Sequence, residues 1–202
     1  MNIQFEKASH KHQAAIFAWL EEPHIKEFWD NSQNHKDDIV NFIQGRKQPS
    51  NYAQGLYSYW VGLMDDQPYS LLMTIQENPS EQRPPIKNAH LSKTGTTYSM
   101  EYMIGDKNYF DKGLGAKTLS AFIDFFHKEV DPSADTFFID PDISNSRAKH
   151  VYEKAGFEYI GDFIMAGDGV FAGRKTHFLL KQIKPTTQCI SIKNAPHFLT
   201  KL

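Results

Sequence analysis

The sequence has a single cysteine, Cys189, among its 202 residues. One cysteine excludes an intramolecular disulfide, so we expect an intracellular protein located in the cytoplasm. The N-terminus lacks the basic-then-apolar layout of a signal peptide. No apolar run approaches the length that spans a bilayer, so we expect no membrane partner.

An excess of positive charge is also missing. The formal net charge is −2 and the pI is near 6.5, which argues against nucleic-acid partners because these normally require a strong basic excess. The nine histidines are scattered, without a second ligand at a suitable spacing, so we predict no metal site.

Apolar periodicity alternates along the chain between strand and helix. A long polar insert at 77–96 interrupts the alternation, and we expect it to be a lid on the acceptor side rather than a passive loop. Strands alternating with helices predict an α/β fold with strands of mixed direction. Strands are predicted at 3–5, 56–64, 69–76, 97–104, 136–139, 157–163 and 176–183, and helices around 16–20 and at 37–45, 113–129 and 145–155.

The most informative segment is the octapeptide from Phe110 to Lys117, Phe-Asp-Lys-Gly-Leu-Gly-Ala-Lys. It lies between the predicted strand 97–104 and the following predicted helix. Free backbone N–H groups and the helix dipole favour an anion at such a turn, and glycines let a phosphate come close to the backbone. Lys112 and Lys117 add positive charge. The alternative is a tight turn with solvated lysines.

A second segment lies about thirty residues further on. It reads Asn145-Ser146-Arg147-Ala148 and ends in Tyr152-Glu153-Lys154-Ala155-Gly156-Phe157. Together the two segments resemble the acyl-CoA core of the GNAT acetyltransferases, over roughly residues 3 to 183. The resemblance implies a GNAT fold, which is a mixed sheet of about six to seven strands with flanking helices and a splayed central strand pair.

The same resemblance implies a GNAT domain at 1–183 and a C-terminal extension at 184–202. The extension is either loosely held or covers a sheet edge or a partner subunit, and the protein is expected to be a monomer or a homodimer. One position departs from the family, because Phe110 stands where many members have Gln or Arg.

The resemblance further implies how acetyl-CoA is held as the co-substrate, with no metal. The loop would bind the pyrophosphate, the end of strand 97–104 would lie along the pantetheine arm, and a backbone N–H near Met103 would polarise the thioester carbonyl. Asn145 would bind the pantetheine chain, cap its helix, or do both. The implied cofactor-binding residues are Met103, Ile104, Lys112, Gly113, Leu114, Gly115, Ala116, Lys117, Asn145 and Arg147.

Two side chains are predicted to be catalytic. Tyr152 is the candidate general acid, because a neutral phenol can donate to a leaving thiolate; the alternative is a core tyrosine. Glu101 is the candidate base or amine-binding carboxylate, because burial in an apolar strand would raise its pKa; the alternative is that it faces water. Trp29, Asp140 and Asp142 are predicted to bind a cationic acceptor, although the aspartates could simply cap their loop.

The segment from Tyr98 to Asp106 is most similar to the aminoglycoside 6′-N-acetyltransferase branch, in which an aspartate stands at the position of Glu101. This similarity implies transfer to a primary amine of a small cationic molecule. The alternatives are a siderophore-biosynthesis acyltransferase acting on a hydroxylysine-like amine, a polyamine or a protein N-terminus as acceptor, and a non-catalytic acyl-CoA-binding module. The last of these would need neither Glu101 nor Tyr152.

Overall fold

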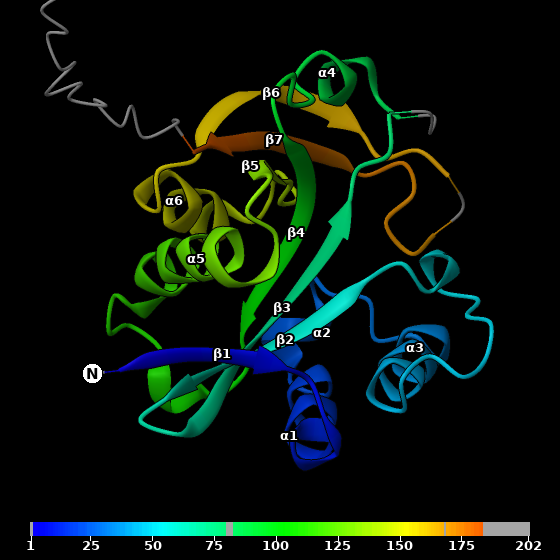
Figure 1. Cartoon of the computed structure of the whole chain (residues 1–202), viewed down its shortest axis with the longest axis vertical. Coiled ribbons are helices and arrows are strands. Elements are labelled where there is room, and N and C mark those ends of the chain that lie inside the picture. Colours follow the sequence, from blue (N-terminus) through cyan, green and yellow to red (C-terminus); the bar gives the residue numbers. More distant parts are fainter. Residues whose placement is uncertain (1, 80–82, 168, 184–202) are drawn as a thin grey trace, which may run out of the picture.

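The computed structural model describes residues 2–79, 83–167 and 169–183. Within these residues one seven-stranded sheet has the order β1-β2-β3-β4-β5-β7-β6, and its layout is seen in Figure 1. The β4–β5 pair is parallel, and every other neighbouring pair is antiparallel. The strands are β1 (Ile3–Lys7), β2 (Ser58–Met64), β3 (Gln67–Gln76), β4 (Thr96–Ile104), β5 (Ala134–Ile139), β6 (Glu158–Ile164) and β7 (Lys175–Gln182).

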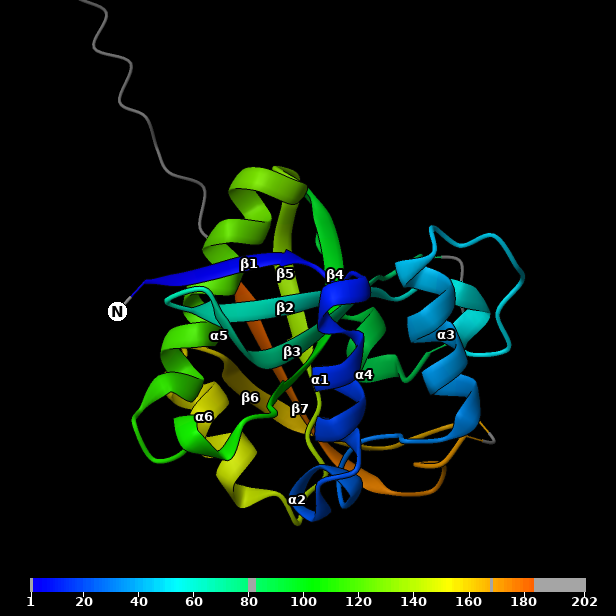
Figure 2. The same cartoon turned by 90° about the horizontal axis from the view of Figure 1, so that it is seen from below.

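Helices cover both faces of this sheet, with α5 and α6 on one side and α1 to α3 on the other (Figure 2). They bury two separate apolar clusters. One joins Leu72 and Met100 to Phe122 of α5, and the other joins Leu71 and Met73 to helices α1 to α3. The helices are α1 (His10–Leu20), α2 (Pro23–Lys26), α3 (Gln33–Ile43), α4 (Pro85–Asn88), α5 (Leu114–Phe125) and α6 (Ser146–Lys154).

Strands β4 and β5 pair over only part of their length. Their register runs from Thr96 opposite Ala134 to Ser99 opposite Phe138. The rest of β4, from 100 to 104, has no partner on β5, although it stays paired with β3 as far as Ile104. The two strands therefore part at the centre of the sheet, which confirms the predicted splayed pair.

Some element boundaries differ from those predicted. Helix α3 begins at Gln33 instead of 37, because the Ser32 side chain caps it by accepting from the His35 N–H. Strand β2 begins at Ser58 rather than 56. The α-helical part of α5 ends at Phe125, and a π-helical turn, Phe126–Val130, follows it.

The insert at 77–96 contains a helix that the sequence analysis did not predict. This helix, α4, starts at Pro85, a residue that suits the first helical position because its missing N–H would have no helical partner. Ile86 packs against the cluster of Phe138, Phe163 and Phe178. A lid function for the insert stays a prediction. The proposed extension at 184–202 lies outside the described residues, so the domain boundary also stays a prediction.

Candidate active site

Glu101 lies on β4, in the segment that has parted from β5. Its side chain shares a face with that of Met103, two residues on, which packs among the residues of α1 to α3. The side chain is half-buried, and the Tyr57 hydroxyl donates a hydrogen bond to its Oε1 at 3.2 Å. The carboxylate is therefore only partly in contact with water.

Burial, together with the nearby Asp140 carboxylate, raises the pKa of Glu101 to about 7. The Tyr57 hydrogen bond and the Lys87 ammonium act in the opposite direction. A carboxyl group that titrates near neutrality can take up a proton and release it again at physiological pH. A role for Glu101 as a general base stays a prediction.

Tyr152 lies on α6, which covers the face of the sheet opposite to α1 to α3. The residue is 7% exposed and packs in the cluster beneath α5, with its ring 6.3 Å from that of Phe157. Burial raises the pKa of Tyr152, and the negative charges of Glu101 and Asp140 raise it further. The phenol therefore stays protonated, as a proton donor must, and three ionisable groups from β4, α6 and the end of β5 influence one another.

The two aspartates after β5 have different surroundings. Asp140 forms an ion pair with Lys87 of α4, with 3.0 Å between Nζ and Oδ2, so the insert reaches the site. Asp142 accepts hydrogen bonds from the backbone N–H and the hydroxyl of Ser144, at 2.9 and 2.6 Å. These bonds lower the pKa of Asp142 and show a loop cap. Contact of either aspartate with an acceptor stays a prediction.

Trp29 is buried against the ring of His35, with 6.3 Å between the ring centroids. Tyr52 stacks on the other rings of this group, 4.6 Å from His35 and 5.8 Å from Tyr57. The tyrosines thus form an aromatic wall that leads from Trp29 to Glu101, and a direct contact of Trp29 with an acceptor stays a prediction. Tyr57 is a site residue that no sequence pattern indicated, because its partner lies 44 positions away.

The predicted anion loop has a left-handed glycine at its centre. Gly113 has a φ of +66° and stands immediately before the first residue of α5. Most other residues resist this conformation, while the space beside its Cα is open. Leu114 points into the core beside Met64 and Tyr69, so it could offer only its backbone to a ligand. The Lys112 ammonium lies over the Tyr109 ring, 5.6 Å from its centroid.

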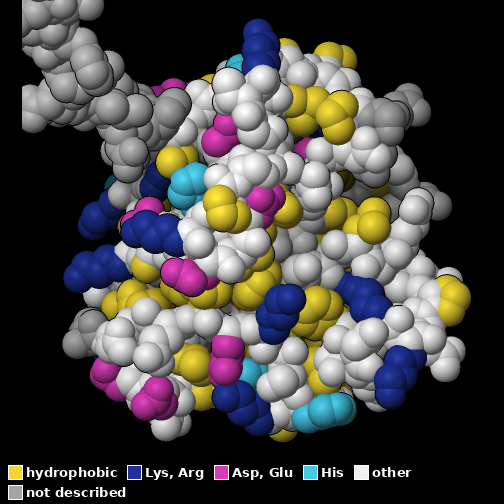
Figure 3. All heavy atoms as spheres, in the orientation of Figure 1, with side chains coloured by type: hydrophobic (Ala, Val, Ile, Leu, Met, Phe, Trp, Pro, Cys, Tyr) yellow, Lys and Arg dark blue, Asp and Glu magenta, His cyan; other side chains and the backbone are white. Residues whose placement is uncertain are grey.

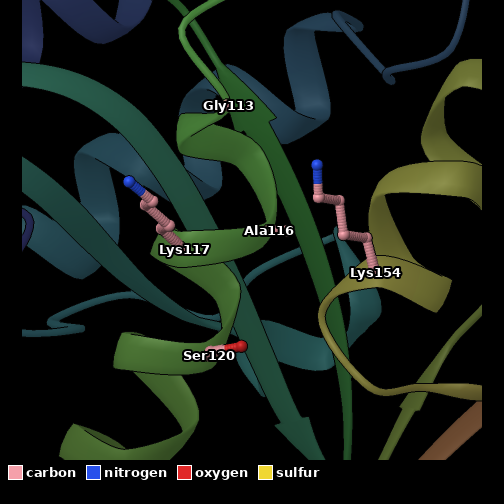
Figure 4. A pocket seen from close by; sticks show the side chains of 5 residues that line it. All are labelled: Gly113, Ala116, Lys117, Ser120 and Lys154. Atoms are coloured by element: carbon pink, nitrogen blue, oxygen red, sulfur yellow. The ribbon is translucent and has the colours of Figure 1, made fainter.

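A hollow of about 590 Å³ opens beside this loop, between α5 and α6. In Figure 4, Lys154 extends from α6 toward the Gly113 end of α5, whereas Lys117 points to the other side of α5. Basic side chains, interspersed with acidic ones, gather over α5 and α6 in the space-filling view (Figure 3). Lys154 and Ser120 are lining residues that sequence analysis did not select. The hollow is lined by Gly113, Ala116, Lys117, Ser120 and Lys154.

The second glycine of the loop has a packing role. A Cβ at Gly115 would lie 2.9 Å from Cγ1 of Val151 on α6, so its absence lets the two helices approach closely. Any contact of Gly115 or Ala116 with a phosphate stays a prediction.

Asn145 and Arg147 begin α6. The Asn145 side chain accepts from the Ala148 N–H at 3.0 Å, which confirms the predicted helix cap. Arg147 donates to Asp111 at 3.0 Å and lies over the Phe110 ring, 5.1 Å from its centroid. Arg147 thus links α6 to Phe110, the position at which the loop departs from the family pattern, and to Asp111 beside it. Binding of pantetheine or phosphate by these two residues stays a prediction.

No group of three or more histidine, cysteine, aspartate or glutamate side chains within 2–79, 83–167 and 169–183 is placed to hold a metal ion. Over the same ranges, every helix is too short or too polar to cross a bilayer.

Comparison with known proteins gives matches over most of the chain. Residues 9–165 match the family model described as acetyltransferase (GNAT) domain. An aminoglycoside N(6′)-acetyltransferase type 1 from Klebsiella pneumoniae is 24% identical over 155 residues, covering 73% of this chain and 70% of the relative.

Two solved structures show the same fold. An aminoglycoside N(6′)acetyltransferase from Legionella pneumophila has a TM-score of 0.67 at 24% identity, over 89% of this chain and 92% of that one. A structure of AAC(6′)-Ib in complex with paromomycin and acetyl-CoA has a TM-score of 0.68 at 18% identity, over 90% and 94% of the two chains.

Proposed function

The chain belongs to the GNAT acetyltransferase family, and we propose that it moves the acetyl group of acetyl-CoA to a primary amine of a small cationic acceptor. The observation that carries this proposal is the half-buried Glu101, whose pKa of about 7 suits a base, in the opening between β4 and β5. Asp140 and the buried Tyr152 influence the same space. A module that only bound acyl-CoA would have no use for this arrangement.

The residues around the opening fit acetyl-CoA, which supplies the acetyl thioester. The free N–H groups at the start of α5 would bind its pyrophosphate, with Lys117 and Lys154 providing positive charge. The unpaired edge of β4, at Met103 and Ile104, would lie along the pantetheine arm together with Asn145. A β4 backbone N–H would polarise the thioester carbonyl.

In the proposed reaction Glu101 accepts a proton from the acceptor ammonium, which frees the nitrogen lone pair. The nitrogen then forms a bond to the carbonyl carbon, and the carbon–sulfur bond breaks. Tyr152 donates its phenolic proton to the departing sulfur, and the resulting phenolate takes up the second proton of the nitrogen, so a neutral thiol and a neutral amide leave and Tyr152 is protonated again. The positions of the two groups on opposite faces of the sheet suit these separate roles.

The acceptor side carries aromatic rings and negative charge. Burial and the negative charge of Glu101 raise the pKa of Tyr52, and the same two causes raise the pKa of Tyr57, so both phenols stay neutral beside the carboxylate. An ammonium group is favoured next to both carboxylates and aromatic faces. Since the relatives are aminoglycoside N(6′)-acetyltransferases, the 6′-amine of an aminoglycoside is the acceptor that we propose first.

The test is release of free thiol from acetyl-CoA by the purified protein with a panel of aminoglycosides, polyamines and hydroxylysine. Turnover with aminoglycosides that carry a 6′-amine, and none with analogues that carry a 6′-hydroxyl, would support the proposed acceptor. Glu101→Gln should bind acetyl-CoA with nearly unchanged affinity and lose roughly 10²-fold or more in turnover. Full turnover in this variant would contradict the role of Glu101.

A further inference from the structure

We infer that Arg46 and Asp38 are positioning residues for the Glu101 carboxylate, and that they act through Tyr57. This inference rests on the proposed function, since it concerns the orientation of the proposed base. Neither residue touches Glu101. The connection runs from Asp38 in the middle of α3 to Arg46 after that helix, then to Tyr57 before β2 and to Glu101 at the centre of β4.

Tyr57 needs such support because the sheet does not hold it. The ladder between β2 and β3 begins one residue later, at Ser58 opposite Thr74. Before it, Ala53 and Gln54 have positive φ values of 43° and 53°, so the chain arrives from an irregular turn. The phenol must nevertheless stay within hydrogen-bond distance of Glu101, at 3.2 Å.

Arg46 supplies the missing support. One of its guanidinium nitrogens donates to the backbone carbonyl of Tyr57, and the other donates to Oδ1 of Asp38 at 2.5 Å. The planar guanidinium can hold both groups at once, which a single ammonium cannot do with the same geometry. The main chain of Tyr57 is therefore fixed relative to α3.

Asp38 in turn holds Arg46 from inside the protein. Its side chain has no exposed surface, and its Oδ2 accepts from the buried Tyr59 hydroxyl at 2.7 Å. Arg46 also has a positive φ of 55°, a conformation that costs energy for a residue with a side chain. A strained backbone and a buried charge are both expensive, and a buried ion pair is weak evidence of added stability. We interpret these unfavourable features as serving to fix the position of Tyr57 through its hydrogen bond with Arg46.

The groups that face Glu101 come from several elements. Tyr57 before β2, Asp140 after β5, Lys87 on α4 and Asp30 before α3 act on its pKa. The neutral phenols of Tyr52 and of Tyr152 on α6 also lie within reach of its charge. The two aspartates favour the protonated form of Glu101, whereas Tyr57 and Lys87 favour the charged form. A displaced Tyr57 would therefore move the titration of Glu101 to higher pH.

The test measures this titration directly, without an acceptor. The full chain is labelled with ¹³C-glutamate, the Glu101 carboxyl signal is assigned with Glu101→Gln, and its shift is followed with pH. Tyr57→Phe removes the hydrogen bond that favours the charged form of Glu101. It should raise the midpoint of the titration by about 0.5 to 1 pH unit, which corresponds to the free energy of one modest hydrogen bond. The double variant Arg46→Met/Asp38→Asn removes both charges of the ion pair, so neither charge is left buried without a partner. It should raise the midpoint of the Glu101 titration by about as much as Tyr57→Phe does.

Adding Tyr57→Phe to the double variant should then change the midpoint little further, because one pathway has already been broken. Arg46→Lys is the second variant should the double variant unfold, and it should give a smaller upward movement. If the double variant folds and keeps the wild-type midpoint, the inference is overturned. If the double variant does not fold, a folded Arg46→Lys variant with the wild-type midpoint overturns it. The acetyl-CoA-induced rise in melting temperature should be the same in all variants. If no amine is acetylated, the proposed function fails while this measurement still decides the positioning role.

Discussion

Replacing Glu101 by glutamine should change the pH dependence of folding stability in a defined direction. The ordinary pKa of a glutamate is 4.5, and burial beside Asp140 raises that of Glu101 to about 7. One pKa unit corresponds to about 1.36 kcal/mol, so this difference of about 2.5 corresponds to about 3 kcal/mol of folding free energy. Because the side chain is half-buried and solvent screens part of the effect, this figure is an upper value.

The sign follows from which state loses its proton first. Below pH 4.5 the group is protonated in both the folded and the unfolded chain, so it makes no difference. As pH rises from 4.5 to 7, the unfolded chain releases the proton while the folded protein keeps it, and the free energy of unfolding falls. Glutamine carries no proton to release, so the Glu101→Gln variant escapes this loss.

We therefore expect the variant to gain stability relative to the wild type between pH 4 and pH 8, by up to about 3 kcal/mol. The assay is urea unfolding followed by circular dichroism at several pH values. The contributions of groups that titrate alike in both proteins cancel when the unfolding free energy of the wild type is subtracted from that of the variant. Glu129→Gln, which removes an exposed negative charge on the π-helical turn, is the matched control. A difference between Glu101→Gln and the wild type that stays constant with pH would refute the burial argument.

Three further variants test other parts of the site. Tyr152→Phe should reduce turnover by roughly 10²-fold in the thiol-release assay while the KM for acetyl-CoA stays nearly constant, and full activity would exclude it as the acid. Gly113→Val forces a β-branched side chain into a φ of +66°, so acetyl-CoA should no longer raise the melting temperature; an intact rise would argue against the anion loop. Gly115→Leu should destabilise the fold by about 1–3 kcal/mol through collision with Val151, and an unchanged melting temperature would contradict the close helix approach.

The sequence was most informative where local pattern and final environment agree. Strands with apolar residues and the helix containing Phe122 were predicted close to their observed bounds, because their buried faces are apolar. The glycine turn and the cap at Asn145 are likewise local features, with geometry set within a few residues.

The rest of the site depends on contacts that local patterns do not encode. The start of α3 was missed because its inward face carries His35 and Asp38, which periodicity treats as surface residues. The Tyr57–Glu101 hydrogen bond spans 44 positions, and the Lys87–Asp140 pair spans 53. Such pairs exist only once β2, the insert and the two central strands have been brought together.

The incomplete pairing of β4 with β5 has a mechanical consequence. The strands from β1 to β4 form one antiparallel ribbon and those from β5 to β7 form another. In the described residues the backbone ladder between the two ribbons has four registered residue pairs. Glu101 belongs to the first ribbon, whereas Asp140 follows a strand of the second. The distance between these two carboxylates therefore depends on the relative orientation of the two ribbons. A molecule bound in the opening between β4 and β5 would contact both ribbons and hold them together. Backbone amide hydrogen exchange should therefore slow in both ribbons when it binds.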